Sequence, residues 1–322
     1  MRRHLLLCAA ALCLGAHANA SAADYPDKPI RLVVPFPAGG ATDLMARTLG
    51  QRLAERLGKG VVIDNRSGAG GGIGAEAVAT AAPDGYTLLF ATMGSLTINP
   101  NLYRSLRYDP VKSFAPITLT HSTSNLLVVH SGVPAQDLAE LVALARSKPG
   151  ELTFASAGNG TTSHLSGELF KSLAGVDLTH VPYKGSAPMV NALLGGEVNL
   201  AFDSASTSLP HVKAGKLHPL AVTGDRRMPM LPDVPTMQEL GVPNFVVNGW
   251  YAILAPAGTP AEITGRLSRE IAAVVAQPEI RAQLEASGYQ LVGSTPAALG
   301  AHIDAELVRW AKVVKDSGAR VD

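Results

Sequence analysis

A short apolar run that ends in prolines and glycines and leads into an amphipathic segment is the feature that most restricts the fold. Residues 30–34 (Ile-Arg-Leu-Val-Val) are largely β-branched and apolar, which is typical of a buried strand. Gly39 and Gly40 then allow a tight turn. Apolar residues afterwards recur at helical spacing, and Thr42 and Asp43 can cap the start of this helix. The stretch therefore predicts a strand, a glycine turn and a helix.

A turn of this kind aims free backbone N–H groups and the positive end of a helix dipole at one point. The arrangement suits an anion such as a carboxylate or a phosphate. The alternative is an ordinary connection between a strand and a helix, with no ligand. The rest of the chain has to decide between these two interpretations.

The first 23 residues have the pattern of a secretory signal peptide. Arg2 and Arg3 form a basic start, residues 5–16 form an apolar core, and small residues follow at positions 18–22. The apolar run is too short to span a bilayer. We therefore expect an exported, periplasmic protein whose signal peptide is removed near residues 20–23.

Composition excludes several kinds of chemistry for the mature chain. Cys8 and Cys13 both lie in the expected signal peptide, so disulfides, thiol catalysis and cysteine metal sites are excluded. Loss of Arg2 and Arg3 changes the formal net charge from +1 to −1, which gives no electrostatic reason to expect binding to nucleic acid. Charged residues make up 16% of the chain, a low share that suits large buried α/β layers.

A glycine-rich stretch at residues 68–74 follows a second short strand, residues 61–63. It matches the G-x-G-x-x-A dinucleotide pattern only weakly, because it starts several residues after the strand and no acidic residue follows strand 86–90. We interpret it as a loop that lets a second helix approach the first. Thr92 and Ser95 come after strand 86–90, and ligands of open parallel sheets bind beside such strand ends.

The second half of the chain repeats the arrangement of the opening stretch. Residues 152–155 predict a strand, and a loop of glycine and hydroxyl residues at 156–163 leads from it into a helix at 164–174. We expect the chain to cross between two lobes near Leu126 and to cross back near Thr223. A second anion-seeking loop in a second lobe is what a two-lobed binding protein needs.

These crossings define the predicted domain organisation. The fold class is α/β with two lobes, each a mostly parallel sheet flanked by helices. Lobe 1 comprises residues 24–126 and 223–322, and lobe 2 comprises residues 127–222.

Two titratable residues lie where a ligand could reach them. Asp203 follows the expected strand 198–202, where it either caps the next helix or meets a ligand ammonium, a ligand hydroxyl or an ordered water. His164 stands at the start of the helix 164–174, where it either packs locally or acts as a general base.

No recognisable catalytic or metal-binding motif accompanies these loops. The mature sequence contains no H-x-x-x-H pair, no G-x-S-x-G elbow and no G-x-x-x-x-G-K-[ST] loop. We therefore expect a binding protein with no catalytic residue, no metal and no cofactor. The rival hypothesis is an exported enzyme that acts on a small organic acid, with His164 and Asp203 as acid–base partners.

Four segments resemble the solute receptors of tripartite tricarboxylate transporters, which are often called Bug proteins. They are PFPAGGATDLMAR at residues 35–47, VVIDNRSGAGGGIGAEAVATAAPDGYTLLFAT at 61–92, GTTSHLSGELF at 160–170 and VPYKGSAPMVNALLGGEVNLAFD at 181–203. The similarity extends over the whole mature chain. It implies a type II periplasmic binding protein fold that closes around a small mono- or dicarboxylate.

The resemblance also implies how that carboxylate is held, namely by backbone N–H groups and ordered waters from both lobes. The expected ligand-contacting residues are Phe36, Ala38, Gly39, Gly40, Asp43, Thr92, Ser95, Gly160, Thr161, Thr162, Ser163, His164 and Asp203. The expected protein partners are the membrane subunits of a tripartite transporter, with a sensor kinase as the alternative, and we expect a monomer. Water-mediated contacts make recognition adaptable, so the family does not fix the ligand.

Overall fold

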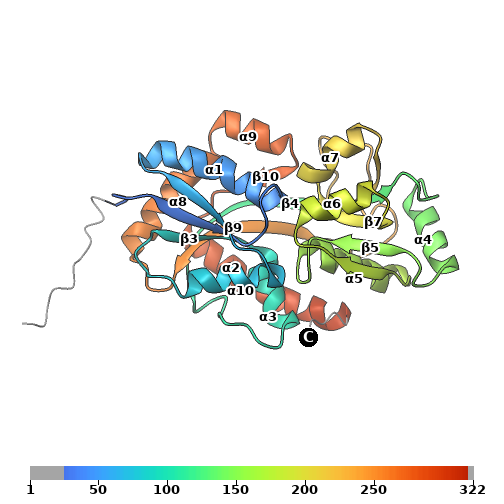
Figure 1. Ribbon diagram of the computed structural model, residues 1–322, viewed down its shortest axis with the longest axis horizontal. Helices are drawn as coiled ribbons and strands as arrows, with labels where there is room; N and C mark the ends of the chain where they lie inside the picture. The colour runs from blue at the N-terminus through green and yellow to red at the C-terminus, as the bar shows by residue number, and fades with distance from the viewer. Residues whose placement is uncertain (1–24, 318–322) are drawn as a thin grey trace, which may run out of the picture.

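The computed structural model describes residues 25–317 of the 322-residue chain. The expected signal peptide and its cleavage site lie outside the described residues. The described chain is an α/β protein with two lobes side by side (Figure 1). A search of residues 25–317 finds no helix with the length and apolar character that a membrane crossing requires.

The first lobe contains a mixed sheet with the strand order β2–β1–β3–β9–β4–β10. β1 is parallel to β2 and β3, whereas β9 is antiparallel to β3 and β4, and β10 is antiparallel to β4. The strands are β1 (Ile30–Val34), β2 (Val61–Asn65), β3 (Thr87–Thr92), the first part of β4 (Phe114–His130), β9 (Asn248–Pro256) and β10 (Tyr289–Leu291).

Helices cover both faces of this first sheet. Leu32 and Val34 pack into one apolar cluster with α1, α8 and α9, and Val33 packs into another with α2 and α10, because successive strand residues point to opposite faces. Burial on both faces explains why every residue of β1 except Arg31 is apolar. The helical elements of this lobe are α1 (Ala41–Leu57), η1 (Ala69–Gly71), α2 (Gly72–Ala79), η2 (Gly94–Ile98), α3 (Asn99–Leu102), α8 (Ala261–Val275), α9 (Pro278–Glu285) and α10 (Pro296–Ser317).

The second lobe contains the strand order β8–β4–β7–β5–β6. β5 is parallel to β6 and β7, and β4 is antiparallel to β7 and β8. Its elements are the last part of β4, α4 (Leu138–Ser147), β5 (Thr153–Ser156), α5 (Thr162–Ala174), β6 (Thr179–Pro182), α6 (Ser186–Leu194), β7 (Leu200–Ser204), α7 (Ala205–Lys213) and β8 (Leu217–Val222).

β4 is one continuous strand that belongs to both sheets. Residues 114–124 pair with β9 in the first lobe, and residues 125–130 pair with β7 and β8 in the second. The first connection between the lobes is therefore an uninterrupted strand. β4 and β9 are neighbours in the first sheet and run in opposite directions. Both sheets are therefore mixed, and the expected parallel pairing is confined to β1–β3 and β5–β7.

The second connection between the lobes lies beside the first. Thr223 follows β8, and its backbone N–H donates to Asn125 O at 2.9 Å. The chain then stays against β8, since Val222 bonds to Pro235 and to Met237. It returns to the same place at Val247, whose N–H donates to Thr223 O at 2.8 Å. Three chain segments thus run side by side where the lobes join.

The last helix, α10, packs against η2 and β4 of the first lobe and also contacts α5 of the second lobe. Its Trp310 is buried, and the indole N–H donates to Glu306 Oε2 at 2.9 Å. The indole of Trp250 on β9 donates to the same oxygen at 3.1 Å. A buried carboxylate therefore joins α10 to the first sheet.

Candidate functional site

A pocket lies between the lobes, where loops that follow β1, β3, β5 and β7 meet. It encloses a cavity of about 50 Å³. Its first-lobe lining includes Phe36, Gly40, Thr42, Thr92, Gly94, Trp250 and Tyr251, and its second-lobe lining includes Asn125, Thr161, Thr162, Ser163, Gly185, Ser186, Asp203 and Ser204. It lies beside the ends of parallel strands, where ligands of open α/β sheets bind.

Four helices begin at this pocket, and each contributes its N-cap residue to the lining. The N-caps are Gly40 of α1, Thr161 of α5, Gly185 of α6 and Ser204 of α7. The N–H groups of a first helical turn have no partner within the helix, and each helix adds the positive end of its dipole. A Cβ added to Gly40 would lie 3.9 Å from the backbone nitrogen of Ser186, so helix ends from the two lobes lie close together.

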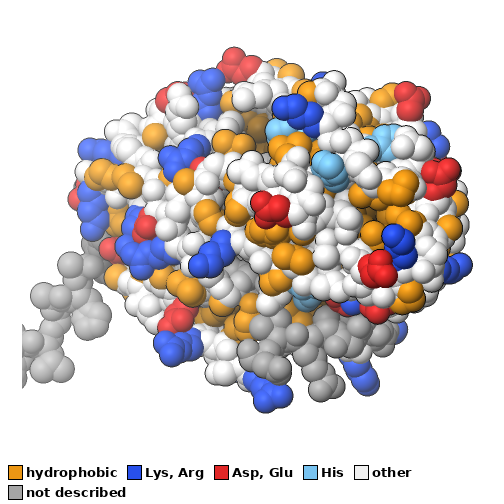
Figure 2. Space-filling view, turned by 45° about the vertical axis from the view of Figure 1, so that its right-hand side comes forward, with side chains coloured by type: hydrophobic (Ala, Val, Ile, Leu, Met, Phe, Trp, Pro, Cys, Tyr) orange, Lys and Arg blue, Asp and Glu red, His pale blue; other side chains and the backbone are white. Residues whose placement is uncertain are grey.

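The charge of the pocket comes from the backbone. Among the described lining residues there is no lysine, arginine or histidine, and Asp203 is the sole carboxylate. On the face shown in Figure 2, acidic and basic side chains are interspersed and form no large basic patch. A pocket that lacks cationic side chains and is ringed by helix N-termini can hold an anion through oriented dipoles.

The expected first-lobe residues divide into lining and supporting residues. Phe36, Gly40 and Thr92 line the pocket, whereas Ala38 and Gly39 are exposed on the loop after β1. Ser95 does not line it but is buried beneath Thr92, and Ser95 Oγ donates to Thr92 O at 2.9 Å. Of these six residues, three line the pocket and a fourth, Ser95, supports one of them.

Asp43 is also a supporting residue. Its Oδ2 accepts from the N–H of Gly39 and from Nε of Arg47, both at 2.9 Å, and its Oδ1 accepts from Asn65 at 3.0 Å. Burial alone would raise the pKa of Asp43, but hydrogen bonds from Arg47, Gly39 and Asn65 together lower it. The carboxylate therefore stays ionised, and its hydrogen bond with the Gly39 N–H holds the glycine turn in place.

The expected second-lobe residues divide in the same way. Thr161, Thr162 and Ser163 line the pocket, and the Thr161 hydroxyl accepts from the N–H of His164 as the cap of α5. Gly160 and His164 do not line it. The Gly160 N–H donates to His164 Nδ1 at 3.3 Å, so His164 supports the loop from behind.

His164 packs in a stack of aromatic rings. Its ring lies on that of His180 of β6 with centroids 4.4 Å apart, and His180 lies on Phe154 with centroids 4.7 Å apart. Burial, together with the charges of His180 and Lys171, lowers the pKa of His164 to about 3. The neutral imidazole can then accept from Gly160. The interpretation of His164 as a residue that packs locally agrees with these contacts.

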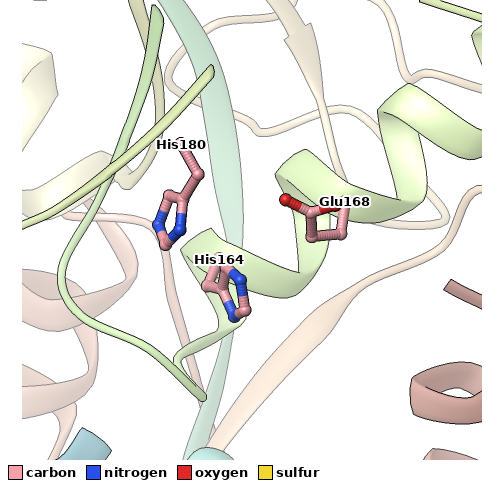
Figure 3. Close-up of side chains that lie close together, drawn as sticks. All are labelled: His164, Glu168 and His180. Atoms are coloured by element: carbon pink, nitrogen blue, oxygen red, sulfur yellow. The ribbon is translucent and has the colours of Figure 1, made fainter. Parts of the chain in front are cut away.

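His164, Glu168 and His180 bring possible metal-ligand atoms within 4.8 Å of one another (Figure 3). The two imidazole planes differ by only 25°, and a nitrogen lone pair lies in the plane of its ring, so the two lone pairs do not converge on one ion. Glu168 is also paired with Lys171 at 3.3 Å. These contacts favour a packed aromatic cluster over a metal centre.

Asp203 lines the pocket, and the cap of α7 is its neighbour Ser204. Asp203 is 1% exposed, and its Oδ2 accepts from the hydroxyls of Thr207 and Ser208, the latter at 2.6 Å. Burial raises the pKa of Asp203, and the hydrogen bonds from Ser208 and Thr207 oppose this shift.

Several lining residues were not anticipated from the sequence. Gly185 and Ser186 begin α6, and the same combination of glycine and hydroxyl before a helix could have identified them. Asn125, Trp250 and Tyr251 come from the interiors of β4 and β9, where no local signal distinguishes a pocket residue from a core residue.

Comparison with known proteins agrees with this geometry. R. palustris Rpa4515 with adipate has a TM-score of 0.90 and 41% identity, over 92% of this chain and 100% of that chain. The periplasmic binding protein BugD has a TM-score of 0.88 and 36% identity, over 92% of this chain and 99% of that chain. MatC from Rhodopseudomonas palustris with bound malate has a TM-score of 0.86 and 34% identity, over 90% of this chain and 100% of that chain. Fold and pocket together define a two-lobed periplasmic-type solute-binding protein.

The family follows from sequence. The family model described as "Tripartite tricarboxylate transporter family receptor" matches residues 45–319. Protein BugT of Bordetella pertussis is 38% identical over 308 residues, which are 95% of this chain and 94% of BugT. The chain belongs to the tripartite tricarboxylate transporter receptor family, and the resemblance noted from its motifs is confirmed.

Proposed function

We propose that this protein captures a small mono- or dicarboxylate between its lobes in the periplasm and delivers it to the membrane subunits of a tripartite transporter. The observation that carries the proposal is the convergence of four helix N-termini on a pocket whose described lining has no cationic side chain. A carboxylate fits such a site because backbone N–H groups can hydrogen-bond both of its oxygens.

Relatives with ligands support the same chemical class. The Rpa4515 structure is described with adipate and the MatC structure with malate. Dicarboxylates of four to six carbons are therefore the first ligands to test on this chain. Secretion after removal of residues 1 to about 20–23 would place the receptor in the periplasm as a soluble monomer.

We further propose that ligand capture closes the lobes about the place where Asn125, Thr223 and Val247 run side by side. The expected lobe boundaries at residues 126 and 223 remain a prediction. Residues 228–242 pack against β8 and its neighbours, so for the second boundary we propose instead that the segment 224–247 moves with lobe 2 and that the chain returns to lobe 1 near residue 247. The shared strand β4 would then bend at its centre during closure.

The contacts do not favour an enzyme that uses His164 and Asp203 as acid–base partners. Asp203 lines the pocket, whereas His164 does not, and its Nδ1 accepts from the Gly160 N–H. A general base must reach the proton that it removes. The proposal therefore includes no catalytic residue, no metal and no cofactor.

A thermal-shift screen of the refolded mature protein tests the proposal. Refolding removes carried-over ligand, and the panel should contain adipate, malate, succinate and benzoate. A ligand at 100 times its Kd adds about 2.7 kcal/mol of stability, which gives a clear rise in Tm. A well-folded protein that no carboxylate stabilises would contradict the proposal.

A pair of variants at Gly40 locates the ligand. A Cβ at this position meets its nearest atoms at 3.7 Å and 3.9 Å, so Gly40→Ala should fold and keep measurable affinity. The larger Gly40→Val side chain should fill the space between the ends of α1 and α6, and reduce affinity at least a hundredfold. Equal affinities for the two folded variants would place the ligand elsewhere.

A separate experiment tests delivery to a transporter against signalling to a kinase. It compares ligand uptake by cells with and without the receptor.

A further inference from the structure

The two oxygens of the Asp203 carboxyl group have unlike surroundings. Oδ2 accepts from Ser208 Oγ at 2.6 Å and from the hydroxyl of Thr207. Oδ1 is buried and has no hydrogen-bond partner among the described residues. An ionised carboxylate distributes its acceptor capacity over both oxygens, whereas a protonated one has an acceptor oxygen and a donor oxygen. An acid whose proton is on Oδ1 fits both observations, because its Oδ2 accepts from the two hydroxyls and its Oδ1–H is left to donate to a ligand.

The side chains around Asp203 also favour the neutral form. Lysine, arginine and histidine are absent from the described lining of the pocket. The titratable groups that face Asp203 are the phenols of Tyr251 on β9 and Tyr289 on β10, and burial raises the pKa of both phenols. The neighbouring groups on α6 and α7 are hydroxyls, namely those of Ser186, Ser204, Thr207 and Ser208. A buried carboxylate without a cationic partner is costly, and a second anion beside it increases that cost.

We propose that Asp203 is a neutral carboxylic acid in the ligand-bound protein and that its Oδ1–H donates a hydrogen bond to the carboxylate of the ligand. This inference rests on the proposed function and specifies how the pocket recognises its ligand. When Asp203 is ionised in the free, open receptor, the protein therefore takes up one proton for each ligand molecule that it binds. A ligand ammonium next to Asp203 would meet a donor where it needs an acceptor, so plain dicarboxylates are preferred over their amino derivatives.

Calorimetric titration with adipate and 2-aminoadipate from pH 5.5 to 8.5 tests the inference, since the two ligands differ only by the ammonium group. We expect wild-type protein to bind adipate at least tenfold more tightly than 2-aminoadipate. We also expect its affinity for adipate to fall, by up to tenfold per pH unit, above the pKa of Asp203 in the free receptor. Titration in two buffers of different ionisation enthalpy should show proton uptake over the same pH range.

Two variants isolate the hydrogen bond. Asp203→Ala should weaken adipate binding at pH 5.5 at least tenfold. Asp203→Asn should recover most of that loss and abolish the pH dependence, because Thr207 and Ser208 orient the amide oxygen and leave its N–H₂ at the Oδ1 position. A preference for 2-aminoadipate, lost in Asp203→Asn, would overturn the proposal in favour of an ionised acceptor.

Infrared difference spectroscopy of the wild-type protein gives a result that does not depend on how the variants fold. Adipate binding should perturb a protonated carboxylic acid band, and ¹³C labelling of aspartate should shift that band. An ionised carboxylate band in its place would overturn the inference while leaving carboxylate capture intact. Failure of every carboxylate to bind at any pH would instead overturn the proposed function itself.

Discussion

Asn125 and Thr223 are joined by a reciprocal pair of hydrogen bonds where the two lobes meet. The Thr223 N–H donates to Asn125 O, and the Asn125 N–H donates to Thr223 Oγ1, both at 2.9 Å. The same hydroxyl donates to Val247 O at 2.8 Å. One buried side chain therefore holds the three connecting segments in register.

We expect Thr223→Val to destabilise the protein by about 1–3 kcal/mol, because it leaves the Asn125 N–H and the Val247 carbonyl without their buried partner. Denaturant unfolding measures this loss. Thr179→Val is the matched control, since the Thr179 hydroxyl bonds to Gly150 O at 2.8 Å at an exposed position. Equal losses for the two variants would show that the hydroxyl of Thr223 has no special part in joining the lobes.

Gly94→Ala should prevent full closure while leaving the fold intact. A Cβ on Gly94 would lie 2.5 Å from the carbonyl oxygen of Gly160 in the opposite lobe. We expect ligand affinity to fall at least tenfold and small-angle scattering to show an open form in saturating ligand. Gly300→Ala in α10 is the control, because its added Cβ has no atom nearer than 3.9 Å. Wild-type affinity in Gly94→Ala would mean that closure does not bring these two loops together.

His121 should make the protein less stable in mild acid. Burial lowers the pKa of His121 to about 3, and its Nε2 has no partner among the described groups. The unfolded chain binds a proton below pH about 6.5, but the folded chain does not until pH about 3. The free energy of unfolding therefore decreases as pH falls through this window, by up to about 1.4 kcal/mol per unit from this residue.

His121→Phe should reduce this slope, because phenylalanine does not titrate and can keep the stack on Tyr251, whose ring centroid is 4.4 Å away. Urea unfolding at pH 7 and at pH 4.5 gives the comparison. His164 and His180, whose pKa values burial lowers to about 3 and about 4, should account for part of the slope that remains. An unchanged slope in the variant would exclude His121 as a source of acid sensitivity.

Glu306→Ala should destabilise the attachment of α10 by at least 2 kcal/mol, because it leaves two buried indole N–H groups without an acceptor. Glu306→Gln keeps an acceptor oxygen and should cost less. Both tryptophans of the chain contact Glu306, so intrinsic fluorescence reports directly on this site. Equal losses of stability in the two variants would contradict the prediction, because they would show that an acceptor oxygen at position 306 does not stabilise the attachment of α10.

The parts of the fold that sequence predicts best are elements whose environment is uniform. β1, buried on both faces, was predicted at its observed bounds. The first part of β4 was not, because it carries polar residues such as Thr118 and Thr120. These side chains are buried and satisfied by Ser294 O at 2.8 Å and Tyr251 O at 3.0 Å, partners distant in sequence.

The candidate site was also only partly predictable from the sequence. Loops that begin helices were recognisable, but which of their side chains face the pocket was not. Successive helical residues point about 100° apart, so Thr162 and Ser163 line the pocket whereas His164 lies behind it. Tyr251 and Asn125 reach the pocket only because β9 and β4 lie at the junction of two lobes, a relationship that no short segment encodes.

The sharing of β4 by both sheets has a consequence for how the chain acquires its structure. β4 is an interior strand of each sheet, and its first-lobe neighbours β9 and β10 come after the whole of the second lobe in the chain. An N-terminal fragment that ends before β9 would leave edges of the first sheet unpaired. The first lobe is thus not an autonomous folding unit, because its sheet is complete only after β9 and β10 have been added, whereas the strands of the second sheet all lie within residues 125–222.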